Sequence, residues 1–341
     1  MPALVLLALT PDLQAASVQL SGNLGVSIVR YHGTRGARTQ MQQDVLDATA
    51  LRILGTRDLG AGAQAVFKIA VPVDLSGGGW GGKLDDSYVG LDSRKWGRMT
   101  FGRQFPSGID RISGSLDAFE VAGSSAHQLP LALLATNAFN GYSARTDNSI
   151  KYTWENDGKI FGMTVAAAEA AGVSDSFGLA LRNGPCQLAA TWIHYRGGTA
   201  LPGGDQAFAG AGANCDTSHG RLYAAAYYRR LRGDASAAVQ RNVVIHLGAL
   251  RRLAERVILT GGVYVDRGIA LGSVAGRDGR KLTAVLASSY AFSPKTRITA
   301  LVFGNWMKRG YRGYAVNADA LDIGLGAGRA SGAALTMSMY F

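Results

Sequence analysis

Apolar and polar residues alternate one by one along much of this chain, and helical spacing is hard to find. Between Leu282 and Phe292, one face of an extended segment carries leucine, alanine and aromatic residues, while the other includes threonine, alanine and serine. Ser149–Trp154 repeats the pattern, with isoleucine, tyrosine and tryptophan opposite serine, lysine and threonine. A period of two predicts β-strands. Lysine or arginine on the polar face favours strands with lipid on one side and water on the other.

We predict an all-β fold, in which about sixteen antiparallel strands close into a transmembrane β-barrel. Short connections carry turn-forming residues, as in 57–60, 156–158, 183–185 and 293–295. By far the longest connection, 105–144, follows the fifth strand. The strands are expected at 17–31, 45–56, 62–73, 84–92, 97–104, 145–155, 160–168, 176–182, 186–195, 206–214, 220–230, 240–250, 255–266, 280–292, 297–307 and 329–341.

The C-terminal strand carries the most specific signal. Its apolar face ends on an aromatic residue and consists of Leu335, Met337, Met339 and Phe341. An open sheet edge in lipid would leave backbone groups without hydrogen-bond partners, so the last strand must pair with the first. We expect that closure around Val18 and Leu20.

The first residues look like an export signal. The apolar run Ala3–Leu9 is followed by Leu13–Ala16, although no basic residue precedes Arg30. This arrangement resembles a secretory signal peptide over residues 1–16, which leaves 17–341 as the barrel. No later stretch of the sequence reads as a helix that could span a membrane.

The net charge and its distribution limit the classes of molecule that this protein is expected to bind. The chain of 341 residues has 35 Lys and Arg against 24 Asp and Glu, a net charge of +11. Removing residues 1–16 takes away Asp12 and no base, so the mature charge rises by one. The basic residues are spread at near-regular intervals, whereas nucleic-acid binding gathers them on one patch. The excess therefore favours anionic solutes or anionic lipid.

Five stretches of the chain carry a family resemblance through their order and spacing. They are Leu51–Gly62, Ser87–Leu91, Trp96–Gln104, Asp147–Tyr152 and Tyr290–Thr296. In these stretches the chain resembles the general porins of Gram-negative bacteria, in the neisserial and related proteobacterial branch. The resemblance implies an outer-membrane barrel of sixteen strands, assembled as a homotrimer without a cofactor, whose third loop folds inward to narrow a diffusion pore.

The resemblance also implies an arginine ladder on the wall, facing acidic residues of the third loop. By motif position the ladder is Arg52, Arg103 and Arg145, and the acids come from Asp110, Asp117 and Glu120. The chain departs from the family in lacking a Pro-Glu-Phe-Gly-Gly stretch in this loop, which leaves the shape of the constriction open.

Strand alternation tests these positions independently. The alternation predicts that Arg52, Lys68, Arg145 and Lys151 point into the lumen. It predicts that Arg103 points outward unless a β-bulge precedes the loop. Basic residues in a narrow channel enrich anions, so we expect a preference for anions. The alternative is that the basic residues are merely solvated and the loop acids merely exposed.

No catalytic or metal-binding pattern stands out in the sequence. The histidines lack metal-ligand spacing, and neither a Gly-x-Ser-x-Gly nor a Cys-x-x-Cys occurs. Aromatic residues such as Tyr152 and Trp306 fit interfacial girdles better than a sugar-binding track. Two other functions remain open. A barrel enzyme acting on lipids would need Ser and His together on the outer surface, and a secreted adhesin would not need the apolar face ending at Phe341.

Cys186 and Cys215 are the only two cysteines, and export places them in an oxidising compartment. If 186–195 and 206–214 form one hairpin, the two residues are directly opposed at the end that carries the short turns. We therefore predict a disulfide. If 206–214 is a loop instead, the thiols lie about a membrane thickness apart and stay separate.

Overall fold

The computed structural model describes residues 16–33, 36–119, 145–166, 173–196, 204–233, 238–315, 318 and 324–341. Residues 1–15, which make up nearly all of the expected signal segment, lie outside this part of the chain, and so does Glu120. Among the described helices, none has the length and apolar composition needed to cross a membrane.

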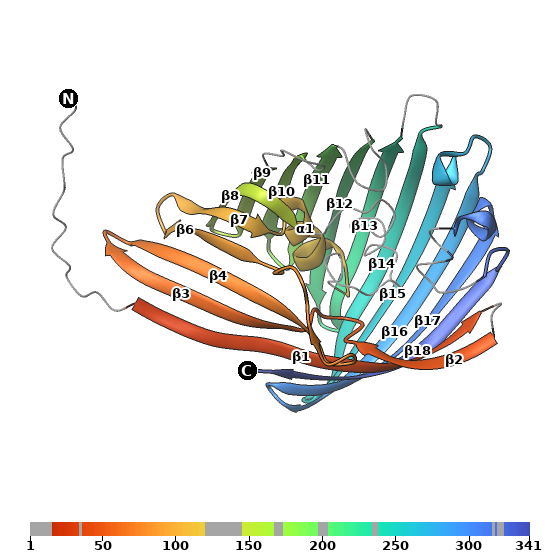
Figure 1. Cartoon of the computed structure of the whole chain (residues 1–341), viewed down its shortest axis with the longest axis horizontal. Helices are drawn as coiled ribbons and strands as arrows, with labels where there is room; N and C mark the ends of the chain where they lie inside the picture. The colour runs from red at the N-terminus through yellow and green to blue at the C-terminus, as the bar shows by residue number, and fades with distance from the viewer. Residues whose placement is uncertain are drawn as a thin grey trace.

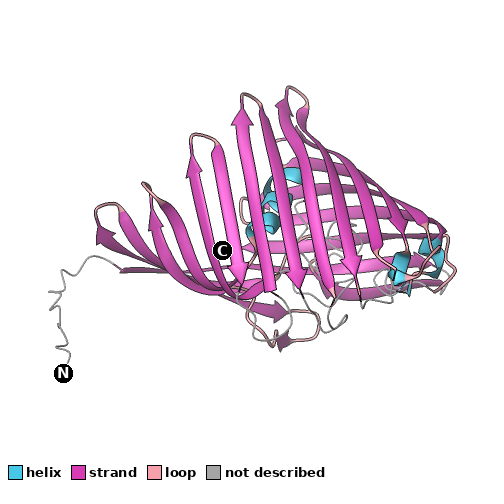
Figure 2. Cartoon of the chain, turned by 90° about the horizontal axis from the view of Figure 1, so that it is seen from above, coloured by secondary structure: helices cyan, strands magenta, loops and turns pink. Residues whose placement is uncertain are grey.

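Antiparallel strands make up most of the described chain (Figures 1 and 2). Successive strands of the wall pair with each other, and β1 also pairs with β18, so the sheet closes on itself. The strands are β1 (Ala16–Gly33), β2 (Gly36–Gln43), β3 (Ala50–Gly60), β4 (Ala63–Asp74), β5 (Gly79–Trp80), β6 (Ser87–Ser93), β7 (Gly97–Gln104), β8 (Thr146–Asn156), β9 (Lys159–Ala166), β10 (Val173–Asn183), β11 (Cys186–Arg196), β12 (Asp205–Thr217), β13 (Gly220–Arg232), β14 (Gln240–Ala254), β15 (Val257–Ile269), β16 (Gly279–Ser293), β17 (Thr296–Arg309) and β18 (Arg329–Tyr340).

The barrel wall has sixteen strands, as the alternation predicts, because two of these elements do not add to it. β5 is a two-residue piece that pairs only with β4. β2 and β3 both pair with β1, one after the other, and so form a single interrupted wall strand. The twelfth element, β12, pairs along its whole length with β11 and β13, so 206–214 is strand rather than loop.

The interruption between β2 and β3 corrects the expected strand 45–56. Val26 pairs with Gln43 and Asn23 pairs with Ala50, so residues 44–49 leave the wall. Asp44 causes this departure, because its carboxylate accepts hydrogen bonds from the backbone N–H of Leu46 and Asp47 at 2.9 and 3.2 Å and so fixes a turn. Ser338 on β18 donates to the same carboxylate, which ties the turn to the barrel wall.

Closure of the barrel is confirmed, but its register differs from the expected one. Phe341 and Gly22 exchange backbone hydrogen bonds of 3.1 and 3.2 Å. Val18 and Leu20 instead pair with β3. The strands of a barrel are staggered relative to one another, so the first residues of β1 extend past the end of β18.

The two faces of the wall differ as lipid and water require. On β16, Leu282 and Leu286 are 39% and 47% exposed, whereas Thr283 and Val285 between them are buried. Many of the inward polar side chains bond across strands, as Thr283 does with Asn305 at 2.6 Å. The outward row of the last strand, Leu335, Met337, Met339 and Phe341, is likewise exposed.

Candidate functional site

The first part of the long connection lies against the inner face of the wall. It contains α1 (Ser107–Arg111) and the π-helical turn η1 (Ile112–Leu116), which pack on β9 to β13 (Figure 1). The backbone N–H of Ser107 donates to Thr164 at 3.0 Å, and that of Gly108 donates to Ser176 at 2.7 Å. Thr164 and Ser176 are buried and inward-facing. Residues 105–119 therefore fold into the lumen, and 120–144 lie outside the described residues.

Close packing explains the glycine at position 108. A Cβ atom there would lie 2.5 Å from Ile193 Cγ1 and 2.6 Å from Thr191 Oγ1, while the Thr191 hydroxyl already donates to the Gly108 carbonyl at 2.8 Å. Only a residue without a side chain lets the loop come this close to β11.

The loop continues across the next strands and is held by its backbone carbonyls. Asn214 donates to the Ser115 carbonyl and Tyr227 donates to the Leu116 carbonyl, both at 2.8 Å. Such inward donors fix the path of a chain that has no sheet partner.

Asp117 lies at the end of this path, fully buried against the wall. The Tyr264 hydroxyl donates to its carboxylate at 2.6 Å, and His246 Nε2 lies 3.5 Å from it. Asp117 thus anchors the loop and does not face the expected arginine ladder. Glu120, the third expected acid, lies outside the described residues.

The expected basic residues lie together on the other part of the wall, from β3 to β8. Lys68 pairs with Asp86 at 2.5 Å, and Arg145 pairs with both Asp85 and Asp86 at 3.0 and 3.1 Å. Arg52 sits opposite Ala70 in the ladder and faces the lumen with them. It makes no salt bridge with any described residue, although its charge acts on Asp85, and its guanidinium donates to the Ala48 carbonyl at 3.5 Å.

Lys151 connects this basic group to the loop. Its ammonium lies 2.5 Å from the carboxylate of Asp110 and donates to the Phe105 carbonyl at 3.0 Å. The guanidinium of Arg145 lies 4.1 Å from the centre of the Phe105 ring, which is a cation–π contact. Asp110 is therefore the expected loop acid that meets the basic wall.

Arg103 lies apart from the other expected pore-lining basic residues, which are Arg52, Lys68, Arg145 and Lys151. Thr100 and Gln104 are buried and bonded to each other at 2.6 Å, so both face the lumen and Arg103 leaves the strand on the outward side. The register of β7 and β8 does shift between Gly102 and Gln104, but this irregularity does not turn Arg103 inward. Its guanidinium instead donates to the Leu84 carbonyl at 2.7 Å and to Asp147 at 2.5 Å.

Sequence reasoning missed the acidic partners Asp85, Asp86 and Asp147. Burial raises the pKa of Asp85 above its ordinary range, although Arg145 opposes the shift. Burial also raises the pKa of Asp86, but Lys68 and Arg145 outweigh it and leave that pKa below the ordinary value. Asp85 and Asp86 directly precede the Ser87–Leu91 motif. Two adjacent acidic residues at the start of a strand were therefore the sequence signal that could have identified them.

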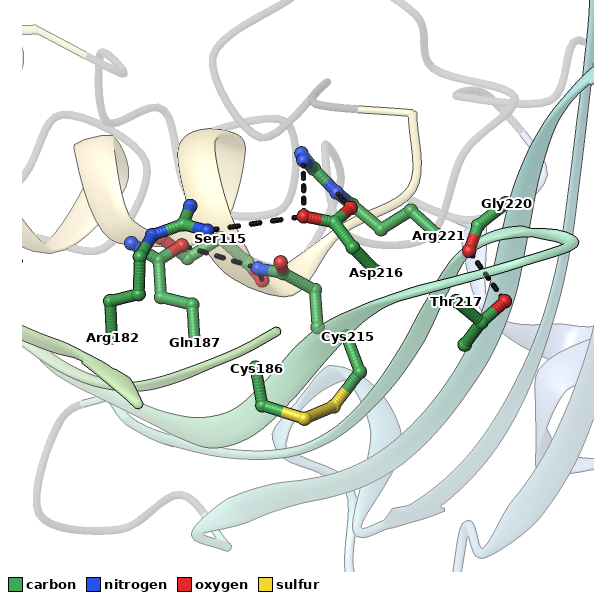
Figure 3. Close-up of a disulfide and its surroundings, with 10 residues drawn as sticks. Ser115, Arg182, Cys186, Gln187, Cys215, Asp216, Thr217, Gly220 and Arg221 are labelled. Carbon is green, nitrogen blue, oxygen red and sulfur yellow. Dashed lines mark hydrogen bonds and ion pairs between the residues drawn. A yellow bond between two sulfur atoms is a disulfide. The ribbon is translucent and has the colours of Figure 1, made fainter. Parts of the chain in front are cut away.

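Cys186 and Cys215 are directly opposed in the β11–β12 ladder and joined by a disulfide (Figure 3). Beside them, Asp216 pairs with Arg221 at 2.7 Å and lies 3.9 Å from Arg182. Asn214, next to Cys215, is the residue that holds the loop at Ser115. The disulfide therefore stabilises the end of the β11–β12 hairpin, and Asn214 holds part of the loop from this end.

The described residues contain no group of side chains that could hold a metal ion. The loop and the wall cluster instead form a charged passage, with Arg52, Lys68, Arg145 and Lys151 on the lumen side and Asp85, Asp86 and Asp110 among them. An arrangement of this kind can select among ions that pass it.

Known proteins agree with this architecture. The model of the Gram-negative porin family matches residues 3–303. An outer membrane porin protein of Bordetella pertussis is 32% identical over 120 residues, which are 34% of this chain but only 29% of that protein.

Two solved structures share the fold over nearly the whole chain. The anion-selective porin from Comamonas acidovorans has a TM-score of 0.77 at 17% identity, covering 96% of this chain and 100% of that one. OmpT of Vibrio cholerae, in its trimer form, has a TM-score of 0.72 at 13% identity, covering 96% and 100%. The match to the family model covers most of the sequence, and the chain therefore belongs to the Gram-negative porin family and is an outer-membrane β-barrel.

Proposed function

We propose that this protein is a passive diffusion channel for small hydrophilic solutes and ions, with a preference for anions. The observation that carries the anion preference is Arg52. It is an inward-facing cation whose charge acts on Asp85 but which forms no salt bridge with a described residue, whereas Lys68, Arg145 and Lys151 each form one with an acid. In this cluster the four bases Arg52, Lys68, Arg145 and Lys151 outnumber the three acids Asp85, Asp86 and Asp110, so the local field is positive.

Family membership and fold point to a channel rather than an enzyme. The Comamonas relative is described as anion-selective, which supports the same preference here. A homotrimer belongs to the proposal because the Vibrio relative has a solved trimer form.

Reconstitution into a planar bilayer tests the channel itself. Stepwise, ohmic increases in current are expected on insertion, and a folded protein that gives no current would contradict the proposal. Size-exclusion chromatography with light scattering tests the trimer separately, because a monomeric barrel can still conduct.

A further inference from the structure

A pocket of about 410 Å³ lies near the ends of β14 to β17 that carry the short turns, beside the C-terminal end of β18. The turn at 44–49 contributes Leu46 and Asp47 to it, the end of the third loop contributes Ala118 and Phe119, and the inner wall supplies the rest. Short turns face the periplasm in outer-membrane barrels. The pocket therefore lies toward the periplasmic end of the lumen, away from the basic cluster on β3 to β8.

One base and one acid line this pocket, and both contact Tyr340. The Tyr340 hydroxyl donates to the Asp47 carboxylate at 3.2 Å, and the guanidinium of Arg297 lies 4.9 Å from the centre of the Tyr340 ring. Arg297 is opposite the buried Ser338 in the ladder, so it faces the lumen. It forms no salt bridge with a described residue. Because both charged groups contact one side chain, a single small solute can reach both.

Asp44, the other acid of the turn, is not accessible from the pocket. Its side chain is buried, and its carboxylate accepts hydrogen bonds from the Ser338 hydroxyl and from the backbone N–H of Leu46 and Asp47. The pocket therefore presents one positive and one negative charge, which sum to zero. The cluster around Arg52 differs, because bases outnumber acids there.

The uncharged lining combines hydroxyl groups with an apolar wall. Ser289 and Thr299 share a hydrogen bond of 2.8 Å, and Thr260 adds a third hydroxyl. Apolar surface in a water-filled lumen is stabilised when an apolar group covers it. The apolar part of the lining consists mainly of Leu46, Phe119, Leu250, Ile258 and Ala287.

We infer that this pocket binds a zwitterionic solute with an apolar side chain, namely a free α-amino acid such as leucine. The carboxylate of the solute lies on Arg297, its ammonium on Asp47, and its side chain against the apolar wall. A solute with one charge binds less well, because an anion is repelled by Asp47 and a cation by Arg297. The inference rests on the proposed function and deepens it, since it names a class of solute that the channel retains during passage.

The test records the current through single channels in planar bilayers at neutral pH and constant ionic strength, while leucine is added. Leucine in the pocket should interrupt the current. N-acetyl-leucine lacks the ammonium and leucine amide lacks the carboxylate, so each should need a roughly tenfold higher concentration, because one hydrogen bond to a charged group is lost. Glycine has both charges but no apolar side chain, and it should also interrupt the current less than leucine.

Substitutions in the pocket test the assignment of the two charges. Arg297→Gln and Asp47→Asn should each raise the leucine concentration needed for half-maximal block roughly tenfold, and Asp47→Asn keeps the test open if Arg297→Gln does not fold. Arg297→Lys retains the positive charge and should retain most of the effect. Lys295→Gln is the matched control, because Lys295 is an exposed base on the adjacent turn and does not line the pocket.

The outcomes separate this inference from the proposed function. Equal block by N-acetyl-leucine or by leucine amide would overturn the inference, because one charge would then suffice. An unchanged leucine effect in both Arg297→Gln and Asp47→Asn would overturn it as well. A channel that conducts but is never interrupted by leucine contradicts this inference alone, whereas a folded protein that gives no current contradicts the proposed function.

Discussion

Lys151 on β8 and Asp110 on α1 form an ion pair of 2.5 Å that joins the basic part of the pore wall to the inward-folded loop. The same ammonium donates to the Phe105 carbonyl, so it holds the loop at the point where the loop leaves β7. The loop is thus fixed on one side by this charge and on the other by the buried carboxylate of Asp117. Substitutions in the Lys151–Asp110 pair or at Asp117 should therefore change the position of the loop.

Removing either partner of the Lys151–Asp110 ion pair should shift the ion selectivity, and the two substitutions should shift it in opposite directions. Asp110→Asn deletes a negative charge at the passage and should increase the preference for anions, whereas Lys151→Met should decrease it. The pair is partly exposed, so we expect a coupling energy of only about 1 kcal/mol in a double-mutant cycle of thermal unfolding. Shifts of selectivity in the same direction for both variants would show that loop movement, and not charge, controls the passage.

Gly108→Ala should disturb the loop because no space exists for a methyl group beside Ile193 and Thr191. We expect a loss of about 1–3 kcal/mol of stability or an equivalent displacement of the loop, visible as a changed single-channel conductance. Gly114→Ala is the matched control in the same loop, since nothing lies within 4 Å of its added Cβ. Equal effects of the two substitutions would contradict the described packing.

Asp86 should stabilise the fold in a pH-dependent way. Its pKa in the folded protein is lowered from the ordinary 3.8 by Lys68 and Arg145, despite burial. A carboxyl with a depressed pKa contributes stability above its unfolded pKa and loses it as pH falls through the folded value. Asp86→Asn should therefore cost about 2 kcal/mol at neutral pH, and the difference from the unsubstituted protein should shrink below pH of about 4.

Thermal unfolding at a series of pH values checks this. Asp85→Asn serves as the comparison, because burial raises the pKa of Asp85 and its ionised form is the costly one. Its effect should have the opposite sign, with relative stability gained at neutral pH. A constant difference between Asp86→Asn and the unsubstituted protein at every pH would contradict the assignment.

The disulfide should be complete in exported protein. Alkylation of denatured, unreduced protein should label neither Cys186 nor Cys215, and reduction should expose both. Cys186→Ser with Cys215→Ser should still give a folded barrel, because the β11–β12 ladder continues on the far side of the pair, but its stability should fall by up to about 3 kcal/mol. Two labelled cysteines before reduction would rule the bond out.

Much of the fold could be predicted because alternation persists through every long strand. The outward row ending at Phe341 also predicted closure. Alternation failed at 44–49, because Asp44 builds a turn from side-chain hydrogen bonds that no period of two reveals.

The site was harder to predict than the fold. Arg52, Lys68 and Lys151 face the lumen as alternation implies, but the partners of a charge depend on loop paths across strands distant in sequence. Asp117 and Asp110 are close in sequence, yet they contact opposite parts of the wall. The net charge of the chain also overstates the positive charge of the pore, because Arg267, Arg280 and Lys308 face outward and do not line it.

The reversal potential of a single channel under a salt gradient tests the central claim most directly. The unsubstituted protein should show an anion preference, which Arg52→Glu should abolish or reverse, because it replaces an inward cation that forms no salt bridge with a described residue by an anion. Arg57→Glu is the control, since Arg57 lies on the same strand and is exposed on the outward face, and it should leave the potential unchanged. A cation preference in the unsubstituted protein, or equal shifts for Arg52→Glu and Arg57→Glu, would contradict the account.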